Sequence, residues 1–179
     1  MENDERIARL LAGNSRYCRT SDAALRERTA VHGQHPRAIV VACSDARVIP
    51  EESFDASLGE LFVIRVAGNV LDNHQLGSIE YAAAHLGCPL VIVLGHTRCG
   101  AVGATLHGES DGFIRYITDE IAAAIGSERD PLRACEKNVR HGVEILRRAF
   151  AEHPEISAAE LEIRGAVYDI ESGAVRWLE

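Results

Sequence analysis

Metal-binding side chains follow two segments of the sequence that have the pattern of buried strands. Cys43 comes directly after the apolar run 38–42. His96 and Cys99 come shortly after a second apolar run, 89–94. Two thiolates and one imidazole are a common ligand set for zinc, and binding sites in open α/β sheets form at the carboxyl ends of neighbouring strands. If the two runs are neighbouring strands, these three residues make a zinc site.

The number of predicted ligands bears on whether the site is structural or catalytic. Structural zinc sites normally have four protein ligands, whereas catalytic sites have three and keep one position open for water. No fourth cysteine or histidine lies at a convincing spacing, because His107 would require the next helix to unwind. Zinc lowers the pKa of a bound water to roughly 7, which makes a nucleophile at neutral pH. The sequence therefore favours a catalytic site.

Asp45 and Arg47 stand close to the first predicted ligand. On an extended segment, the side chains of residues 43, 45 and 47 point to the same side. We expect Arg47 to hold Asp45 by a bidentate ion pair, which keeps the carboxylate ionised and away from the metal. If that pair broke, Asp45 could become a fourth ligand and close the site.

Each of these fragments also has an ordinary explanation. A lone cysteine at a strand end is usually a small buried apolar residue. The pattern His-x-x-Cys occurs often by chance, and Asp-x-Arg is commonly a surface ion pair of little energetic value. Because both fragments occur together, each after a buried strand, the sequence favours the metal site over these explanations.

Strand-like and helix-like segments alternate along the chain, which predicts an α/β fold. We expect a mainly parallel four-stranded sheet plus a C-terminal strand, with helices on both faces. Strands are predicted at 38–42, 61–66 and 89–94, and the chain ends in two strands joined by a turn at 171–173. Apolar side chains at helical spacing predict helices at 4–18, 76–86, 113–125 and 131–150, with loops at 68–75 and 108–112.

Composition and charge restrict the classes of protein to which the chain can belong. It has 179 residues, 46% of them hydrophobic, and its 19 basic and 27 acidic residues give a formal charge of −8. We expect one domain, residues 1–179, without a nucleic-acid partner. The apolar runs are too short to span a membrane, and the charged N-terminus is unlike a signal peptide. Five cysteines, an odd number, indicate reduced thiols in the cytoplasm rather than disulfides.

Four longer motifs carry a resemblance to a known family. The chain resembles the β-class carbonic anhydrases in CSDARV, ELFVIRVAGN, LGSIEYAAAHLG and LGHTRCGAV, in that order and at that spacing, and the likeness covers nearly the whole chain. The resemblance implies one zinc ion per subunit, held by Cys43, His96 and Cys99. It implies the reversible hydration of carbon dioxide to bicarbonate and a proton by zinc-bound hydroxide. Asp45 and Arg47 would be catalytic, gating the fourth zinc position and orienting the hydroxide.

The same resemblance implies a substrate pocket at a subunit boundary. Its residues would be Gln34, Phe62, Ala67, Tyr81 and Gly100. Gln34 and Gly100 would position the substrate by hydrogen bonds, whereas Phe62 and Ala67 would form an apolar wall. Gln34, Phe62 and Tyr81 could then serve the zinc of a partner subunit. We expect a homodimer or a dimer of dimers, with the helix at 4–18 packed on the partner.

The sequence departs from the family pattern at two positions. Some bacterial members have a tryptophan three residues before the first zinc cysteine, as part of an inhibitory bicarbonate site. Val40 stands there in this chain, so we expect that site to be absent. Val66 stands where most relatives have asparagine, which removes a polar group near the pocket.

Three other functions remain open at this point. A hydrolase of carbonyl sulfide or carbon disulfide would use the same attack by hydroxide on a linear electrophile. A non-catalytic zinc-binding homologue would keep the metal without activity, although the presence of Asp45 and Arg47 argues against it. A thiol-redox protein is disfavoured because the chain has no Cys-x-x-Cys, and we expect the remaining cysteines to be packing residues: Cys18, Cys88 and Cys135.

Overall fold

The computed structural model describes residues 3–151, 153, 156 and 161–179, which belong to two units. The first unit ends at Gln34 and the second begins at His35. The first contains α1 (Asn3–Thr20), which includes the helix predicted at 4–18, and α2 (Ala23–His32), which was not predicted. Neither helix has a buried residue, and α1 exposes three apolar side chains to more than half of their full extent: Ile7, Leu10 and Leu11.

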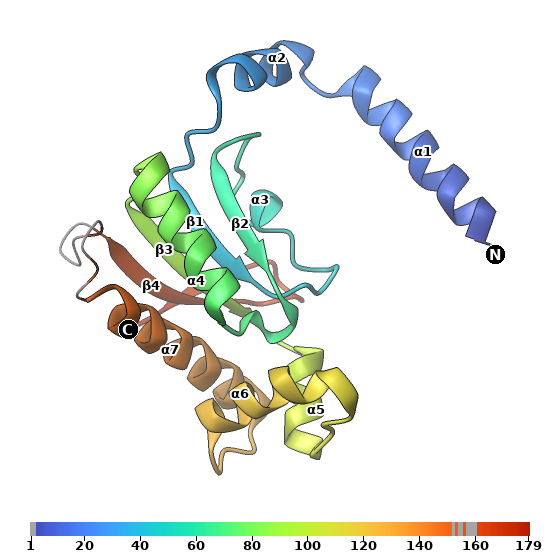
Figure 1. The fold of residues 1–179 in the computed structure, drawn as a ribbon. Helices are drawn as coiled ribbons and strands as arrows, with labels where there is room; N and C mark the ends of the chain where they lie inside the picture. Colours follow the sequence, from blue (N-terminus) through green and yellow to red (C-terminus); the bar gives the residue numbers. More distant parts are fainter. Residues whose placement is uncertain (1–2, 152, 154–155, 157–160) are drawn as a thin grey trace. The chain divides into compact units, whose positions relative to one another are not determined.

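A five-stranded sheet in the order β2-β1-β3-β4-β5 organises the second unit (Figure 1). Four strands run parallel: β1 (Ala38–Ala42), β2 (Leu61–Arg65), β3 (Leu90–His96) and β4 (Glu162–Tyr168). The last strand, β5 (Val175–Leu178), pairs with β4 in the antiparallel direction. The predicted sheet of four parallel strands with an added C-terminal strand is confirmed.

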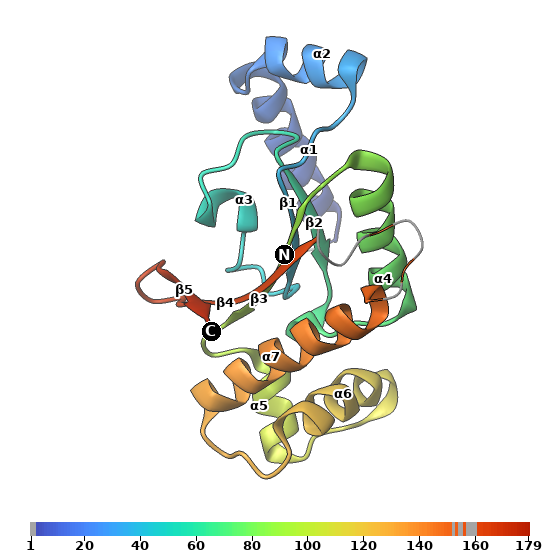
Figure 2. The same ribbon diagram turned by 90° about the vertical axis from the view of Figure 1, so that its left-hand side faces the viewer.

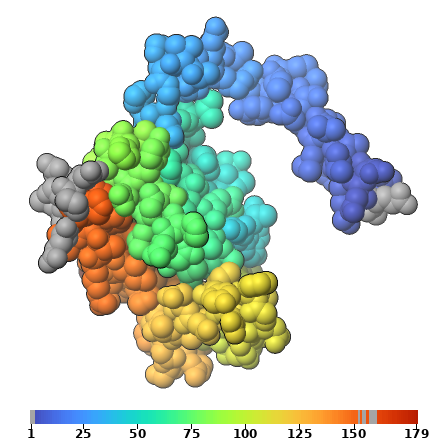
Figure 3. Space-filling view, viewed as in Figure 1, coloured from blue at the N-terminus to red at the C-terminus, as the bar shows by residue number. Residues whose placement is uncertain are grey.

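Helices lie on both faces of this sheet, as predicted (Figure 2). One face is covered by α7 (Pro131–Phe150), α4 (Asn73–Glu80) and the π-helical turn η2 (Tyr81–His85). In the space-filling view, the green α4 and the orange α7 lie next to each other (Figure 3). The other face carries the short helix α3 (Pro50–Ser53). None of the described helices is both long and apolar enough to cross a lipid bilayer.

The alternation of side chains along the strands separates the core into two layers. Ile39 and Val41 of β1 pack in the cluster that contains α7, whereas Val40 and Ala42 pack in the cluster on the opposite face. All five residues of β1 are buried, which explains the continuous apolar run in its sequence. The strand next to the site is therefore held from both sides.

Two segments predicted as loops are partly helical. The loop predicted at 68–75 contains part of the 3₁₀ turn η1 (Ala67–Asn69) and the start of α4. The side chain of Asp72 accepts a hydrogen bond from His74 N, and Gln75 Oε1 accepts one from Asp72 N. This reciprocal capping moves the helix start from the predicted residue 76 to residue 73. The second loop, 108–112, ends where a 3₁₀ turn, η3 (Gly112–Ile114), begins.

Two further helices lie at the carboxyl edge of the sheet: α5 (Gly100–His107) and α6 (Arg115–Ile125). The predicted helix at 113–125 corresponds to η3 followed by α6. Residues of both helices pack with Cys43 and Cys99 in a third apolar cluster. Apolar side chains of α5 and α6 therefore pack against the two cysteines of the predicted metal site.

Helix α7 packs closely against β3 and β4 at two glycine positions. It has the predicted bounds, with Pro131 at its start and the side chain of Asp130 accepting a hydrogen bond from Arg133 N. A Cβ atom at Gly95 would lie 2.5 Å from Val139 Cγ2, and one at Gly165 would lie 2.8 Å from Val139 Cγ1. The absence of a side chain at these two strand positions allows the helix to lie this close to the sheet.

We predict that Gly95→Ala destabilises the fold by about 1–3 kcal/mol, because the added methyl group overpacks against Val139. Chemical denaturation of the two proteins measures the difference. Gly77→Ala in α4 is the matched control, since a Cβ there meets nothing within 4 Å beyond its own helix backbone and chain neighbours, and alanine favours a helix. Equal stability of Gly95→Ala and the wild type would contradict the close approach of α7.

Candidate metal centre

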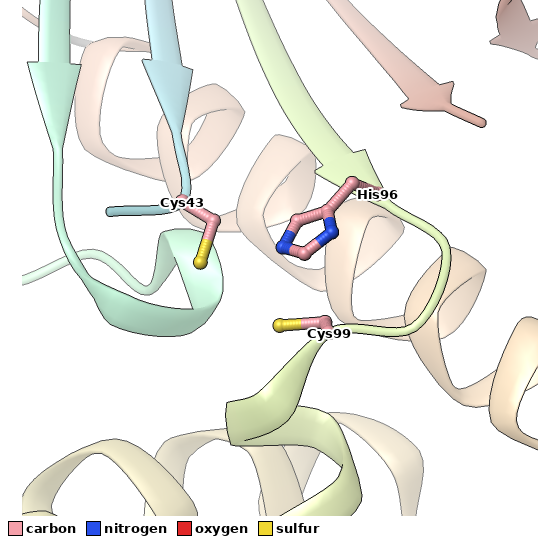
Figure 4. Close-up of side chains that lie close together, drawn as sticks. All are labelled: Cys43, His96 and Cys99. Atoms are coloured by element: carbon pink, nitrogen blue, oxygen red, sulfur yellow. The ribbon is translucent and has the colours of Figure 1, made fainter. Parts of the chain in front are cut away.

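Three metal-binding side chains converge where β1 and β3 end (Figure 4). Cys43 directly follows β1, His96 is the last residue of β3, and Cys99 directly precedes α5. Their ligand atoms all lie within 4.8 Å of one another, and all three residues are buried. The structure brings these three together as predicted because β1 and β3 are neighbouring parallel strands.

A tight turn returns Cys99 to the side of His96. Arg98 adopts the left-handed conformation with φ of 56°, which reverses the direction of the chain between the two ligands. The turn is held through Thr97, whose Oγ1 donates to Asp169 Oδ2 at 3.3 Å and accepts from Ile170 N at 3.1 Å. The hairpin between β4 and β5 thus supports the turn that carries two of the ligands.

The main chain around Gly68 faces the first ligand, Cys43. Gly68 N donates a hydrogen bond to Cys43 Sγ at 3.2 Å. Gly68 has a φ of 70°, and a Cβ there would lie 2.8 Å from Ile121 Cδ1. A residue with a side chain would therefore be both strained and crowded. Arg65 adds a second support, since its Nε donates to the carbonyl oxygen of Cys43 at 3.1 Å.

The protonation of the ligands fits a divalent cation. His96 Nδ1 lies 2.9 Å from Thr97 O, and a carbonyl only accepts, so Nδ1 carries the proton. His96 Nε2 then offers a lone pair, yet it is buried without a hydrogen-bond partner. A hydrogen bond between the two thiols lowers the pKa of Cys43, and the same contact, together with burial, raises the pKa of Cys99. Two neighbouring thiols beside an imidazole nitrogen with a free lone pair are a donor set that suits zinc.

Asp45 and Arg47 form the predicted bidentate pair. Arg47 Nε donates to Asp45 Oδ1 at 2.9 Å, and Arg47 Nη2 donates to Asp45 Oδ2 at 2.7 Å. These hydrogen bonds, and the Arg47 charge, hold the pKa of Asp45 well below its usual range. Asp45 Oδ2 lies 4.0 Å from His96 Nε2, so the ionised carboxylate borders the metal site.

The expectation that residues 43–47 are extended was wrong. The segment turns after Asp45, because Val48 N donates to Asp45 O and Arg47 N donates to Asp45 Oδ1, both at 3.0 Å. An aspartate that accepts from the main chain two residues further on stabilises such a turn. The ion pair is therefore made within a turn, and not by side chains on one side of a strand.

The residues predicted to line the substrate pocket fall into separate groups. Ala67 precedes the glycine that contacts Cys43, and Gly100 directly follows Cys99. The rings of Phe62 and Tyr81 pack against each other instead, with centroids 6.3 Å apart. Phe62 pairs in register with Ile39, which is four residues before Cys43. Phe62 is therefore about 13 Å from that ligand along the strand direction. Gln34 belongs to the first unit.

Two residues of α7 support the site in a way that the sequence did not predict. Cys135 was expected only to pack, but its Sγ donates to His96 O at 3.2 Å, and burial raises its pKa to about 12. Asn138 had no predicted role, and its Nδ2 donates to Gly68 O at 2.8 Å. A polar residue on the apolar stripe of a helix was the available signal for Asn138. Of the other two cysteines, Cys88 is buried as predicted, whereas Cys18 is exposed.

Comparison with known proteins agrees with this geometry. The family model described as carbonic anhydrase matches residues 38–175. Carbonic anhydrase 2 of Mycobacterium tuberculosis is 40% identical over 152 residues, which cover 79% of this chain and 73% of that protein. The structure of the β-carbonic anhydrase CcaA has a TM-score of 0.82 at 26% identity, covering 98% of this chain and 88% of that one. One of two tetrameric β-carbonic anhydrases of Sordaria macrospora has a TM-score of 0.73 at 27% identity, with coverage of 99% and 98%.

The fold and the donor set define an α/β protein with a metal centre of two cysteines and one histidine. The chain belongs to the carbonic anhydrase family and, within it, to the β class.

We predict that Cys99→Ala removes the metal, because only two of the three ligands remain. Metal analysis of purified protein should give one zinc per chain for the wild type and close to none for the variant. Cys88→Ala is the control, since Cys88 is equally a buried free thiol but lies outside the ligand cluster. Full zinc content in Cys99→Ala would show that the ion is held elsewhere.

Proposed function

We propose that this protein catalyses the reversible hydration of carbon dioxide to bicarbonate and a proton, with one zinc ion per subunit. The observation that carries the proposal is the set of three ligands, Cys43, His96 and Cys99, without a fourth metal-binding residue in their cluster among the described residues. A three-ligand site keeps a coordination position for water. The match to the carbonic anhydrase family over residues 38–175 supports the same reaction.

In this proposal, the residues around the zinc hold and orient the reactants. Zinc supplies the nucleophile by lowering the pKa of its water to about 7. Asp45, which Arg47 holds by two hydrogen bonds, would accept a hydrogen bond from such a water and would stay off the metal. Gly100 occupies the first position of α5, where backbone N–H groups lack helical partners and can donate to a substrate oxygen. Ala67 offers an apolar contact for carbon dioxide.

The aromatic pair is assigned to a neighbouring subunit in the same proposal. Phe62 lies about 13 Å along the strand from its own metal ligands, and its ring packs against that of Tyr81. We infer that they complete the pocket of a partner subunit, together with Gln34. The exposed apolar side chains of α1 support an assembly in which the helix at 4–18 packs on that partner. The assembly would be a homodimer or a dimer of dimers, and the tetrameric enzymes from Sordaria macrospora favour the second.

We also propose that the protein works in the cytoplasm. All five of its cysteines are free thiols, and two of them are metal ligands. Oxidation of Cys43 and Cys99 would disable the site, and thiols stay reduced in the cytoplasm.

We predict that Arg47→Ala lowers kcat/KM for hydration by about 10–100-fold. Without the guanidinium, the pKa of Asp45 rises towards its ordinary value, and a carboxylate 4.0 Å from His96 Nε2 becomes free to bind the metal. Stopped-flow measurement of carbon dioxide hydration tests this change. Arg164→Ala is the control, because it removes an exposed pair with Glu162 on β4. Wild-type activity in Arg47→Ala would refute the role of the ion pair.

The proposed reaction itself is tested on one sample of zinc-loaded protein. We expect zinc-dependent hydration of carbon dioxide that exceeds the hydrolysis of carbonyl sulfide and carbon disulfide. Faster turnover of either sulfur compound would assign the protein to the hydrolases. Bound zinc without any turnover would identify it as a non-catalytic zinc protein.

A further inference from the structure

Two buried polar side chains of α7 form hydrogen bonds beside different metal ligands, one near Cys43 and the other at His96. Cys135 and Asn138 lie one helical turn apart and are 3% and 5% exposed. Both fall on the apolar stripe with which α7 covers the sheet. A polar group in such a place is costly unless it is hydrogen-bonded, so the partner of each side chain matters.

Asn138 is connected to the first ligand by two hydrogen bonds. Asn138 Nδ2 donates to Gly68 O at 2.8 Å, and Gly68 N donates to Cys43 Sγ at 3.2 Å. Asn69, which follows Gly68, has a φ of 46°, a conformation that costs energy in residues other than glycine. The contact from α7 therefore fixes a strained turn in the orientation that directs an N–H group at the sulfur.

Cys135 is connected to the second ligand directly. Its Sγ donates to the carbonyl oxygen of His96 at 3.2 Å. The ring of His96 is oriented by its own contact with Thr97 O, so the main chain of residues 96–97 determines where Nε2 points. A hydrogen bond to His96 O holds that main chain from the side of α7.

Helix α7 is packed tightly against β3, the strand that carries His96, and against β4. Val139, next to Asn138, fills the space above Gly95 and Gly165 on two adjacent strands. The helix is therefore packed against the sheet beside the ligands, and its polar side chains are held at fixed distances from them.

We propose that Asn138 and Cys135 are positioning residues for the metal ligands: Asn138 directs the Gly68 N–H group at Cys43 Sγ, and Cys135 holds the main chain of His96. The proposal rests on the metal centre of the proposed function and assigns a role to two residues outside it. A hydrogen bond to a metal-bound thiolate reduces the charge that the sulfur donates, so its loss changes both the affinity and the electronic state of the metal.

The test uses Asn138→Leu, which keeps the side-chain size but cannot donate, and Cys135→Ala. The conservative variant Cys135→Ser retains a donor. Leu146→Ala is the control, because Leu146 is fully buried on the same helix and is not among the residues that contact the ligands. We measure the rate of zinc release to a chelator and the thiolate-to-metal absorption band of the cobalt-substituted protein.

We expect Asn138→Leu and Cys135→Ala to release zinc at least about 10-fold faster than the wild type and to shift the cobalt band. Cys135→Ser should stay close to the wild type. Leu146→Ala should lower the thermal midpoint while leaving the band unchanged, because a purely structural change does not reach the ligands.

The inference is overturned if Asn138→Leu and Cys135→Ala lose thermal stability as Leu146→Ala does but keep the wild-type zinc release and cobalt band. If Asn138→Leu does not fold, Asn138→Asp is used instead. Aspartate has the shape of asparagine but places an acceptor towards Gly68 O. A wild-type cobalt band in Asn138→Asp equally overturns the inference. A wild-type protein that binds neither zinc nor cobalt would instead reject the proposed function.

Discussion

The parallel pairing of β1 with β3 is the constraint on which the metal centre depends. Their register places Ala42 opposite Leu94, so both strands end at the same edge of the sheet. Cys43 and His96 come from these two ends. The turn that follows His96 places Cys99 beside them, and all three ligand atoms lie within 4.8 Å of one another. The strand order 2-1-3-4-5 makes this edge a topological switch point, where the loops that leave neighbouring strands separate and expose a site.

This arrangement has an energetic cost that the rest of the second unit offsets. Arg98 and Asn69 are held at positive φ, and the Nε2 lone pair of His96 is buried without a partner. Packing of α7 against β3 and β4, and of α5 and α6 beneath the cysteines, holds these groups in place. A bound metal would satisfy the lone pair and the thiolates together, which couples metal binding to the stability of the fold.

Local sequence patterns predicted much of the fold because buried apolar residues repeat every two to four residues along a strand or helix. The continuous apolar run of β1 and the stripe of α7 are visible over a few residues, and their elements appear with the predicted bounds. Errors arose where hydrogen bonds between side chain and main chain replaced the regular pattern. The turn after Asp45 and the capping box at Asp72 are such cases. Helix α2 carries no buried residue, so it lacked the amphipathic signal altogether.

The sequence by itself determined which residues can bind a metal, because their type and their position after buried strands are local properties. It also determined the bidentate pair of Asp45 and Arg47, which are only two residues apart. Only the tertiary structure decided that Asn138 and Cys135 support the ligands, since these contacts join residues 70 and 39 positions apart. The separation of Phe62 from the ligands was likewise decided by strand register, which depends on pairing between distant segments.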